Sequence, residues 1–183
     1  MRRLATVGIC AVLISGRAAA FNLHSADATY TEGVFRVSFE AVLDAPRESI
    51  EAVLADYTLY VRLDPRIKRA QSLGRQPDGT QLVRTQIDAC AALFCRTVER
   101  VERVAHQPGL MVATVVPERS DMRHGVASTR FQSLGSGTLV IYHAEFEPDF
   151  WVPGFIGHRY AVRELRVAIL KMFTNVEREA RAH

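Results

Sequence analysis

The side chains best spaced for acid–base chemistry are those of His143, Glu145 and Glu147, which alternate along one apolar segment of the chain. Residues two apart share a face of a β-strand, so these three would lie on one face and Tyr142 and Phe146 on the other. With the histidine face inward, His143 and Glu145 could act as a general acid–base pair. With the aromatic face inward they are solvated, which is the arrangement that burial of apolar side chains favours.

Two cysteines, Cys90 and Cys95, offer a second kind of chemistry. No histidine pair stands near them at ligand spacing, so we expect no metal site. In an oxidising compartment the two thiols would form a disulfide that pins a local turn, although two separate buried thiols remain an alternative.

The compartment is indicated by the N-terminus. Arg2 and Arg3 precede an apolar stretch at 4–14, and small residues follow at 18–20, which is the order of a secretion signal. We therefore predict a signal peptide at 1–20, cleavage after Ala20, and a periplasmic or secreted single domain at 21–183. The alternative is a retained membrane anchor, for which the apolar stretch has only about half of the ~20 residues required.

Charge excludes one class of partner. Removal of residues 1–20 takes away three arginines and no acid, so the 23 basic and 20 acidic side chains become 20 of each. A near-neutral chain without a basic run does not fit a nucleic-acid binder. The sequence also lacks phosphate-loop and dinucleotide motifs, and we expect no cofactor.

The elements that must position these residues follow from periodicity. Residues 34–43 alternate as a half-buried strand, and a helix opens at Pro46, followed by a shorter helical piece at 58–63. Six further strands are predicted at 67–75, 81–90, 95–105, 109–117, 124–134 and 138–147, and their short gaps indicate an antiparallel meander. Helical spacing at 158–180 predicts a long C-terminal helix that buries its apolar stripe on this sheet.

In a meander, alternate turns lie at the same end of the sheet, so the turns at 91–94, 118–123 and 148–157 should cluster. Two of them carry apolar tips, which are Leu93 and Phe94 in the first and Trp151 and Phe155 in the third. Grouped apolar tips are typical of a ligand mouth or a transient contact with a membrane surface. The alternative is that Trp151 and Phe155 fold inward over the core.

The middle turn is charged. Arg119 or Arg123 could hold a phosphate or carboxylate head group at the rim through bidentate contacts. A solvated hairpin tip explains the same residues, and it is the simpler interpretation.

The segment at 41–73, AVLDAPRESIEAVLADYTLYVRLDPRIKRAQSL, resembles the START-like, Bet v 1-like (SRPBCC) superfamily. The resemblance is to the branch of polyketide cyclase/dehydrase-type lipid-transport proteins and coenzyme-Q-binding proteins, and it rests on Ala45-Pro46, Asp56-Tyr57, Tyr60 and Pro65. It implies an α+β helix-grip fold, in which a curved antiparallel sheet of seven strands wraps around the long C-terminal helix, with two short helices after the first strand.

A strongly twisted sheet cannot contact a straight helix along its whole length, so a cavity is expected between them. We predict that it binds an apolar molecule such as a lipid, an isoprenoid quinone or a polyketide-like compound, without need of a catalytic residue. The expected lining is Phe39, Tyr57, Tyr60, Phe131, Tyr142, Trp151, Phe155, Leu165 and Met172. The alternatives are a cyclase/dehydratase-type enzyme that uses the same cavity and an interaction module with a filled interior.

Overall fold

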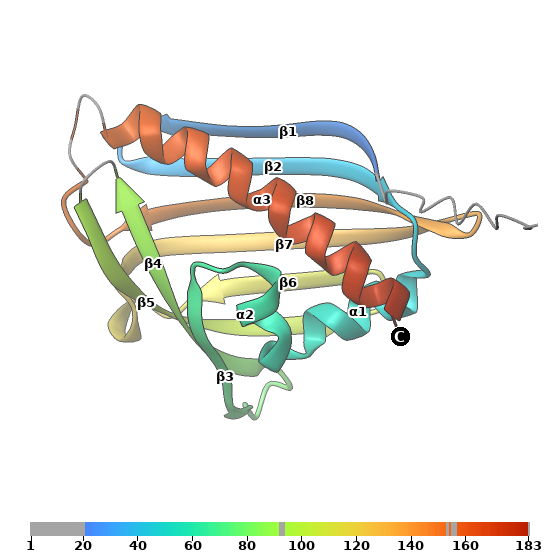
Figure 1. Ribbon diagram of the computed structural model, residues 1–183. Helices are drawn as coiled ribbons and strands as arrows, with labels where there is room; N and C mark the ends of the chain where they lie inside the picture. Colours follow the sequence, from blue (N-terminus) through green and yellow to red (C-terminus); the bar gives the residue numbers. More distant parts are fainter. Residues whose placement is uncertain (1–20, 92–93, 153, 155–156, 183) are drawn as a thin grey trace, which may run out of the picture.

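The computed structural model describes residues 21–91, 94–152, 154 and 157–182 (Figure 1). The predicted signal peptide at 1–20 lies outside the described residues, as do Leu93 and Phe155. The strands are β1 (Asn22–Thr31), β2 (Val34–Leu43), β3 (Ile67–Arg75), β4 (Gln81–Ala91), β5 (Phe94–Gln107), β6 (Leu110–Val115), β7 (Met122–Leu134) and β8 (Gly137–Pro148). The helices are α1 (Arg47–Ala55), η1 (Tyr57–Leu59), α2 (Tyr60–Leu63), η2 (Pro117–Arg119) and α3 (Gly157–Ala182).

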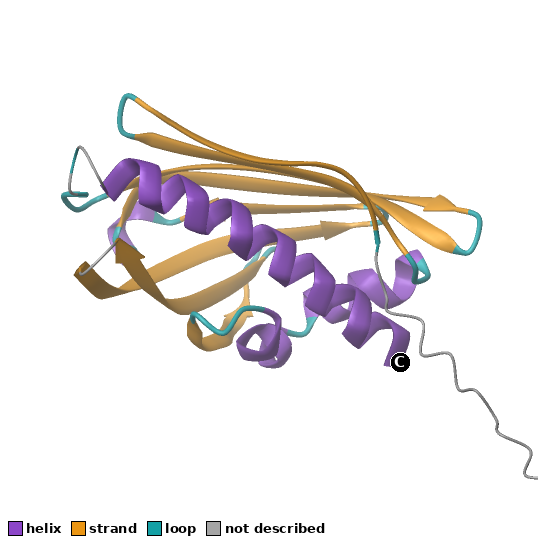
Figure 2. Cartoon of the chain, turned by 45° about the horizontal axis from the view of Figure 1, so that its top comes forward, coloured by secondary structure: helices purple, strands orange, loops and turns teal. Residues whose placement is uncertain are grey.

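The strands form one antiparallel sheet in the order β1-β2-β8-β7-β6-β5-β4-β3. The sheet curves around α3, which crosses its concave face, while α1 and α2 cover one end (Figures 1 and 2). This is the predicted α+β helix-grip arrangement, and the six meander strands and the C-terminal helix lie within a few residues of their predicted bounds.

The predicted strand number was too low, because the sheet has eight strands and β1 was missed. The inner face of β1 carries small or partly polar side chains, including Ala26 and Ala28, so its apolar alternation is weak. Its hairpin with β2 turns through Glu32 and Gly33, both at positive φ, which suits a tight two-residue connection. β1 is therefore held in place by its pairing with β2 and its packing against α3, and not by an apolar alternation of its own.

The core lies under the C-terminal half of α3. Phe173 stacks on Phe39 of β2 with ring centroids 4.4 Å apart, and both side chains are fully buried. Val176 and Ala180 continue the buried stripe toward α1, as predicted for this helix. Burial of these large apolar surfaces joins helix and sheet most firmly at this end.

Polar contacts reinforce the same end of α3. The buried Glu177 carboxylate accepts a hydrogen bond from the backbone N–H of Asp44 at 3.0 Å, at the corner between β2 and α1. The Asn175 amide donates to the carbonyl of Leu63 in α2 at 2.9 Å. The C-terminal half of α3 is thus tied to the sheet corner and to both short helices.

We expect truncation of Phe173 to be severely destabilising. Phe173→Ala should lower the free energy of unfolding by about 3–5 kcal/mol, because it removes the ring that fills the space above Phe39. Val167→Ala on the exposed side of the same helix should change it by less than about 0.5 kcal/mol. Urea denaturation followed by circular dichroism measures both, and equal losses would contradict this account of the core.

Candidate ligand-binding cavity

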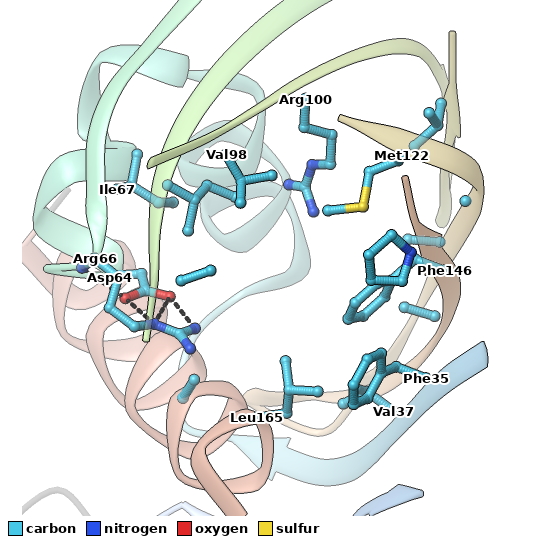
Figure 3. Close-up of a pocket in the computed structure, with 18 of the residues that line it drawn as sticks. Phe35, Val37, Asp64, Arg66, Ile67, Val98, Arg100, Met122, Phe146 and Leu165 are labelled. Carbon is cyan, nitrogen blue, oxygen red and sulfur yellow. Dashed lines mark hydrogen bonds and ion pairs between the residues drawn. The ribbon is translucent and has the colours of Figure 1, made fainter. Parts of the chain in front are cut away.

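A cavity of about 490 Å³ lies between the N-terminal half of α3 and the inner face of the sheet (Figure 3). Phe35 and Val37 of β2, Phe146 of β8 and Leu165 of α3 supply much of its apolar wall. The volume is within the range of small-molecule sites in proteins.

Small side chains on the sheet explain why this space is open. Ala113, Ala127 and Ala144 pair directly across β6, β7 and β8, so a row of methyl groups faces α3. Toward the other end of the sheet, Phe39 of β2 and Phe131 of β7 stand in two successive rows, level with Tyr142 and Val140 of β8, and both pack into the core. The space is thus open over these three alanines, with Phe35 and Phe146 at its border, and it is closed where Phe39 and Phe131 pack into the core.

Two ionisable residues, Arg100 and Glu102, face this apolar interior from β5. Val98 and Val104 stand on the same face of β5, one on either side of this pair, and also line the cavity. The Arg100 Nε and a Glu102 carboxylate oxygen form an ion pair at 3.0 Å, and 29% of the Arg100 side chain and 10% of the Glu102 side chain remain uncovered. The guanidinium points into the cavity in Figure 3, so we assign its uncovered surface to the cavity rather than to bulk water.

The electrostatics agree with this burial. Burial by itself lowers the pKa of the Arg100 guanidinium, but Glu102 and the neighbouring acidic and phenolic groups outweigh it and the pKa is raised overall. Burial raises the pKa of Tyr142 to about 12, and the Arg100 charge opposes this rise. Arg100 therefore stays charged and the Tyr142 phenol stays neutral at physiological pH.

A second ion pair lines the cavity at the turn between α2 and β3. The Arg66 side chain donates hydrogen bonds to the buried Asp64 carboxylate from Nε at 3.0 Å and from Nη2 at 2.6 Å (Figure 3). The backbone N–H of Arg66 also donates to Asp64 at 3.0 Å. Because Asp64 accepts several hydrogen bonds from Arg66, the pair holds the turn in place. The two opposite charges add no net charge to the cavity wall.

Two further tyrosines border the cavity near the short helices. The Tyr60 hydroxyl donates to the carbonyl of Leu54 at 2.8 Å, and burial raises its pKa. The Tyr57 hydroxyl lies 3.0 Å from His106 Nε2, burial raises its pKa to about 12, and burial also lowers the pKa of His106. Both phenols have partners in the protein, so they form a fixed polar edge to the site.

The cavity reaches the surface beside the loop that follows β8. Its lining there includes Trp151, whose side chain is 77% exposed, and Phe150, whose ring lies 4.3 Å from the Arg96 guanidinium carbon. The backbone N–H of Asp149 donates to the carbonyl of Asp121 at 2.9 Å, so the loops at 118–123 and 148–152 adjoin as predicted.

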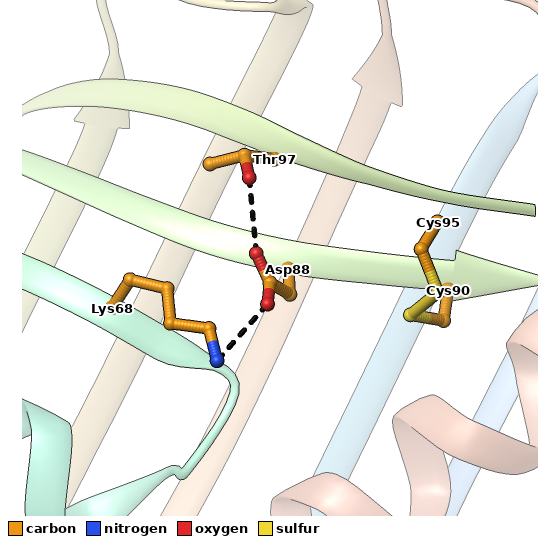
Figure 4. The surroundings of a disulfide bond; sticks show 5 residues. All are labelled: Lys68, Asp88, Cys90, Cys95 and Thr97. Atoms are coloured by element: carbon orange, nitrogen blue, oxygen red, sulfur yellow. Dashed lines mark hydrogen bonds and ion pairs between the residues drawn. A yellow bond between two sulfur atoms is a disulfide. The ribbon is translucent and has the colours of Figure 1, made fainter.

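Cys90 of β4 and Cys95 of β5 also line the cavity, and they form the predicted disulfide (Figure 4). Asp88 on β4 pairs with Lys68 of β3 at 3.0 Å and accepts a hydrogen bond from Thr97 of β5 at 3.0 Å. Covalent and polar cross-links therefore hold β3, β4 and β5 together at the rim of the cavity.

Six of the residues predicted to line the cavity do so, and they are Tyr57, Tyr60, Tyr142, Trp151, Leu165 and Met172. Phe39 and Phe131 do not belong to its wall, because both are buried in the packed core instead. Nothing can be said of Leu93, Phe155 or the side chain of Phe94, since these lie outside what the structure describes.

The polar residues singled out by spacing lie elsewhere. His143 is exposed, and the Glu145 carboxylate pairs with Arg36 and His124 on the outer face of the sheet. Neither Arg119 nor Arg123 is part of the cavity wall, and Arg123 binds Asp149 at 2.8 Å and Glu147 at 3.2 Å. Of these four residues, Glu145 alone is part of the cavity lining, and its carboxylate is engaged with Arg36 and His124 instead.

Sequence reasoning missed Arg100, Glu102, Asp64 and Arg66. The available signal was the even-numbered run on β5, where two charged residues stand between Val98 and Val104. Charged residues at 99 and 103 hide this pattern, because both faces of the strand then look polar.

The described ranges contain no cluster of three or more histidine, cysteine, aspartate or glutamate side chains that could hold a metal ion. Within the same ranges, no helix is both long enough and apolar enough to cross a membrane.

A family model for polyketide cyclase/dehydrase and lipid-transport proteins matches residues 34–178. The chain belongs to this family. This family is part of the START-like, Bet v 1-like superfamily that the segment at 41–73 resembles. The match begins at β2, so β1 precedes the part of the chain that the family model covers.

Solved structures share the fold at low identity. A protein of Thermus thermophilus matches with a TM-score of 0.65 and 17% identity, over 80% of this chain and 97% of its own. The Zhui aromatase/cyclase of a Streptomyces species matches with a TM-score of 0.59 and 18% identity, over 81% and 94%. A STAR-related lipid transfer protein of Xanthomonas axonopodis matches with a TM-score of 0.60 and 13% identity, over 88% and 98%. No curated protein matches the sequence at a significant level.

Proposed function

We propose that this protein binds an apolar small molecule in the cavity under α3 and carries it outside the cytoplasm. The observation that supports this most directly is the 490 Å³ apolar space between Phe35, Phe146 and Leu165. Each buried methylene group of a lipid, an isoprenoid quinone or a polyketide-like molecule would contribute about 0.8 kcal/mol. Such a ligand needs no catalytic residue in order to be held.

Export is part of the proposal and rests on the charged, apolar and small-residue order at 1–20. A disulfide between Cys90 and Cys95 is compatible with it, because disulfides persist in oxidising compartments.

An enzyme of the cyclase/dehydratase type is the second candidate. The specific observation in its favour is that Arg100, Glu102 and Tyr142 place polar groups inside the cavity. The fold shared with an aromatase/cyclase and with a lipid transfer protein is compatible with either candidate. His143 and Glu145, the catalytic candidates from spacing, give the enzyme no support from their positions on the sheet.

Native mass spectrometry of the protein taken from the exported fraction of its own host tests both parts of the first proposal. We expect a chain that begins at Phe21 and carries a single bound organic molecule, which extraction then identifies. Recovery of the chain from the cytoplasmic fraction alone, with residues 1–20 retained, would contradict export. A ligand-free species that takes up neither lipid nor quinone would contradict the carrier.

Filling the row of alanines should abolish binding. We expect Ala127→Phe to weaken binding of the uncharged dye N-phenyl-1-naphthylamine by about tenfold or more, because the ring would occupy the space beneath α3. Ser128→Phe, which adds the same ring to the neighbouring position on the opposite face of β7, serves as the control. Dye fluorescence gives both affinities, and equal weakening in the two variants would contradict binding in this cavity.

We also propose that the open end of the cavity touches a membrane surface, since the exposed Trp151 is located there. Trp151 is the only tryptophan of the chain, so its emission reports this contact directly. Addition of phosphatidylethanolamine/phosphatidylglycerol vesicles should shift the emission to shorter wavelength, and Trp151→Ser should reduce co-sedimentation with the vesicles. An unshifted spectrum together with unchanged co-sedimentation would contradict the contact.

A further inference from the structure

Three side chains on the inner face of the sheet, from β5, β4 and β8, carry hydrogen-bonding groups that the surrounding protein leaves without partners. Arg100 Nε lies 3.0 Å from a Glu102 carboxylate oxygen as an ion pair, but this buried Nε–H makes no hydrogen bond. Within the described part of the chain, the two Nη atoms have no hydrogen-bond partner either, so the donors of the guanidinium are left over. Thr85, directly opposite Arg100 on β4, has a buried hydroxyl that likewise has no partner among the described residues. The Tyr142 hydroxyl, which also lines the cavity, makes no hydrogen bond to the described residues either. Such groups are costly to bury unless something satisfies them.

Arg100 and Arg66 each have an acidic partner, and the other charged residues of the wall are Arg96, Asp88, Glu145 and Glu164, so the wall has no excess of positive charge. Arg100 is balanced by Glu102 at 3.0 Å, and across the cavity Arg66 is balanced by Asp64 at 2.6 Å. An ionised ligand would therefore bring an uncompensated charge into an apolar enclosure, and the loss of its hydration would oppose binding. An uncharged oxygen could accept hydrogen bonds from Arg100 without that penalty, and bonds to a charged donor are stronger than bonds between neutral groups.

From these observations we infer that the cavity contains a head-group subsite, formed by Arg100, Glu102 and Tyr142, that selects ligands ending in an uncharged oxygen acceptor such as a ketone, ester or quinone carbonyl. The rest of the ligand lies along the alanine row and Leu165. This inference rests on the proposed function, and it narrows the ligand class to neutral amphiphiles rather than free acids or phosphates.

Glu102 is the residue that enforces this choice. Its carboxylate offsets the Arg100 charge, and the guanidinium stays protonated whatever its partner. Replacing Glu102 with the isosteric glutamine would leave the Arg100 charge without its ion-pair partner. A carboxylate would then become the better partner, so removal of one charge should reverse the order of preference.

The test uses two ligands of equal chain length, 2-dodecanone and dodecanoate, at pH 8, where a carboxyl group of pKa about 4–5 is fully ionised. Each competes with N-phenyl-1-naphthylamine for the full mature chain. The wild type should bind 2-dodecanone at least about tenfold more tightly than dodecanoate, because only the acid adds a buried net charge. Glu102→Gln should bind dodecanoate more tightly than 2-dodecanone. Glu99→Gln, on the outer face of the same strand, should keep the wild-type order.

Arg100→Gln provides a second variant if Glu102→Gln does not fold, as judged by circular dichroism and the urea midpoint. It leaves the Glu102 charge without its partner, so the affinity for 2-dodecanone should fall about tenfold and dodecanoate should bind no better than to the wild type. Failure of the dye to bind the wild type at all would contradict the proposed function. Dye binding with no ketone preference in the wild type, or with an unchanged order in Glu102→Gln, would overturn the head-group subsite alone.

Discussion

The structure depends on one geometric constraint, which is that a straight helix can pack closely against a curved sheet only along part of its length. α3 makes that close contact at its C-terminal half, where Phe173 meets Phe39 and Glu177 binds the chain at Asp44. At its N-terminal end α3 contacts the edge strand β1, where His158 stacks on Tyr30 with ring centroids 3.8 Å apart, and between these two contacts the helix spans the cavity. The cavity is a consequence of where the contact lies, and the alanine row keeps it open.

Most of the fold could be predicted because alternation of apolar side chains is clear on most strands, as in Phe35, Val37 and Phe39 of β2. β1 could not be predicted from its own residues. Ala26 and Ala28 are too small to mark a buried face, and the strand is stabilised by its partners in the sheet and in α3. The local sequence signal was Gly33, because glycine readily adopts the positive φ that a tight hairpin requires and that the structure shows there.

The candidate site was predicted in outline but not in its polar chemistry. Aromatic and long apolar residues such as Tyr142 and Leu165 were identified from the faces of their strand and helix. Phe39 was wrongly placed in the cavity wall. The sequence shows which side chains of a strand face inward, but it does not show at which end of the strand α3 packs against them. Arg100 and Glu102 were missed since a buried ion pair has the same composition as a solvated one, and only the strand register places it inside.

The buried ion pair changes what the apolar cavity can do. Hydrophobic burial alone grows with the number of methylene groups and hardly distinguishes one lipid from another of equal length. An ion pair held in an apolar enclosure is a poor source of stability, because desolvation of both charges offsets their attraction. Its effect on binding would be different, because it would lower the affinity for any ligand that leaves a buried charge or hydrogen-bond donor without a partner. Affinity in this cavity would thus come from Phe35, Phe146 and Leu165, whereas the choice between ligands would come from Arg100 and Glu102.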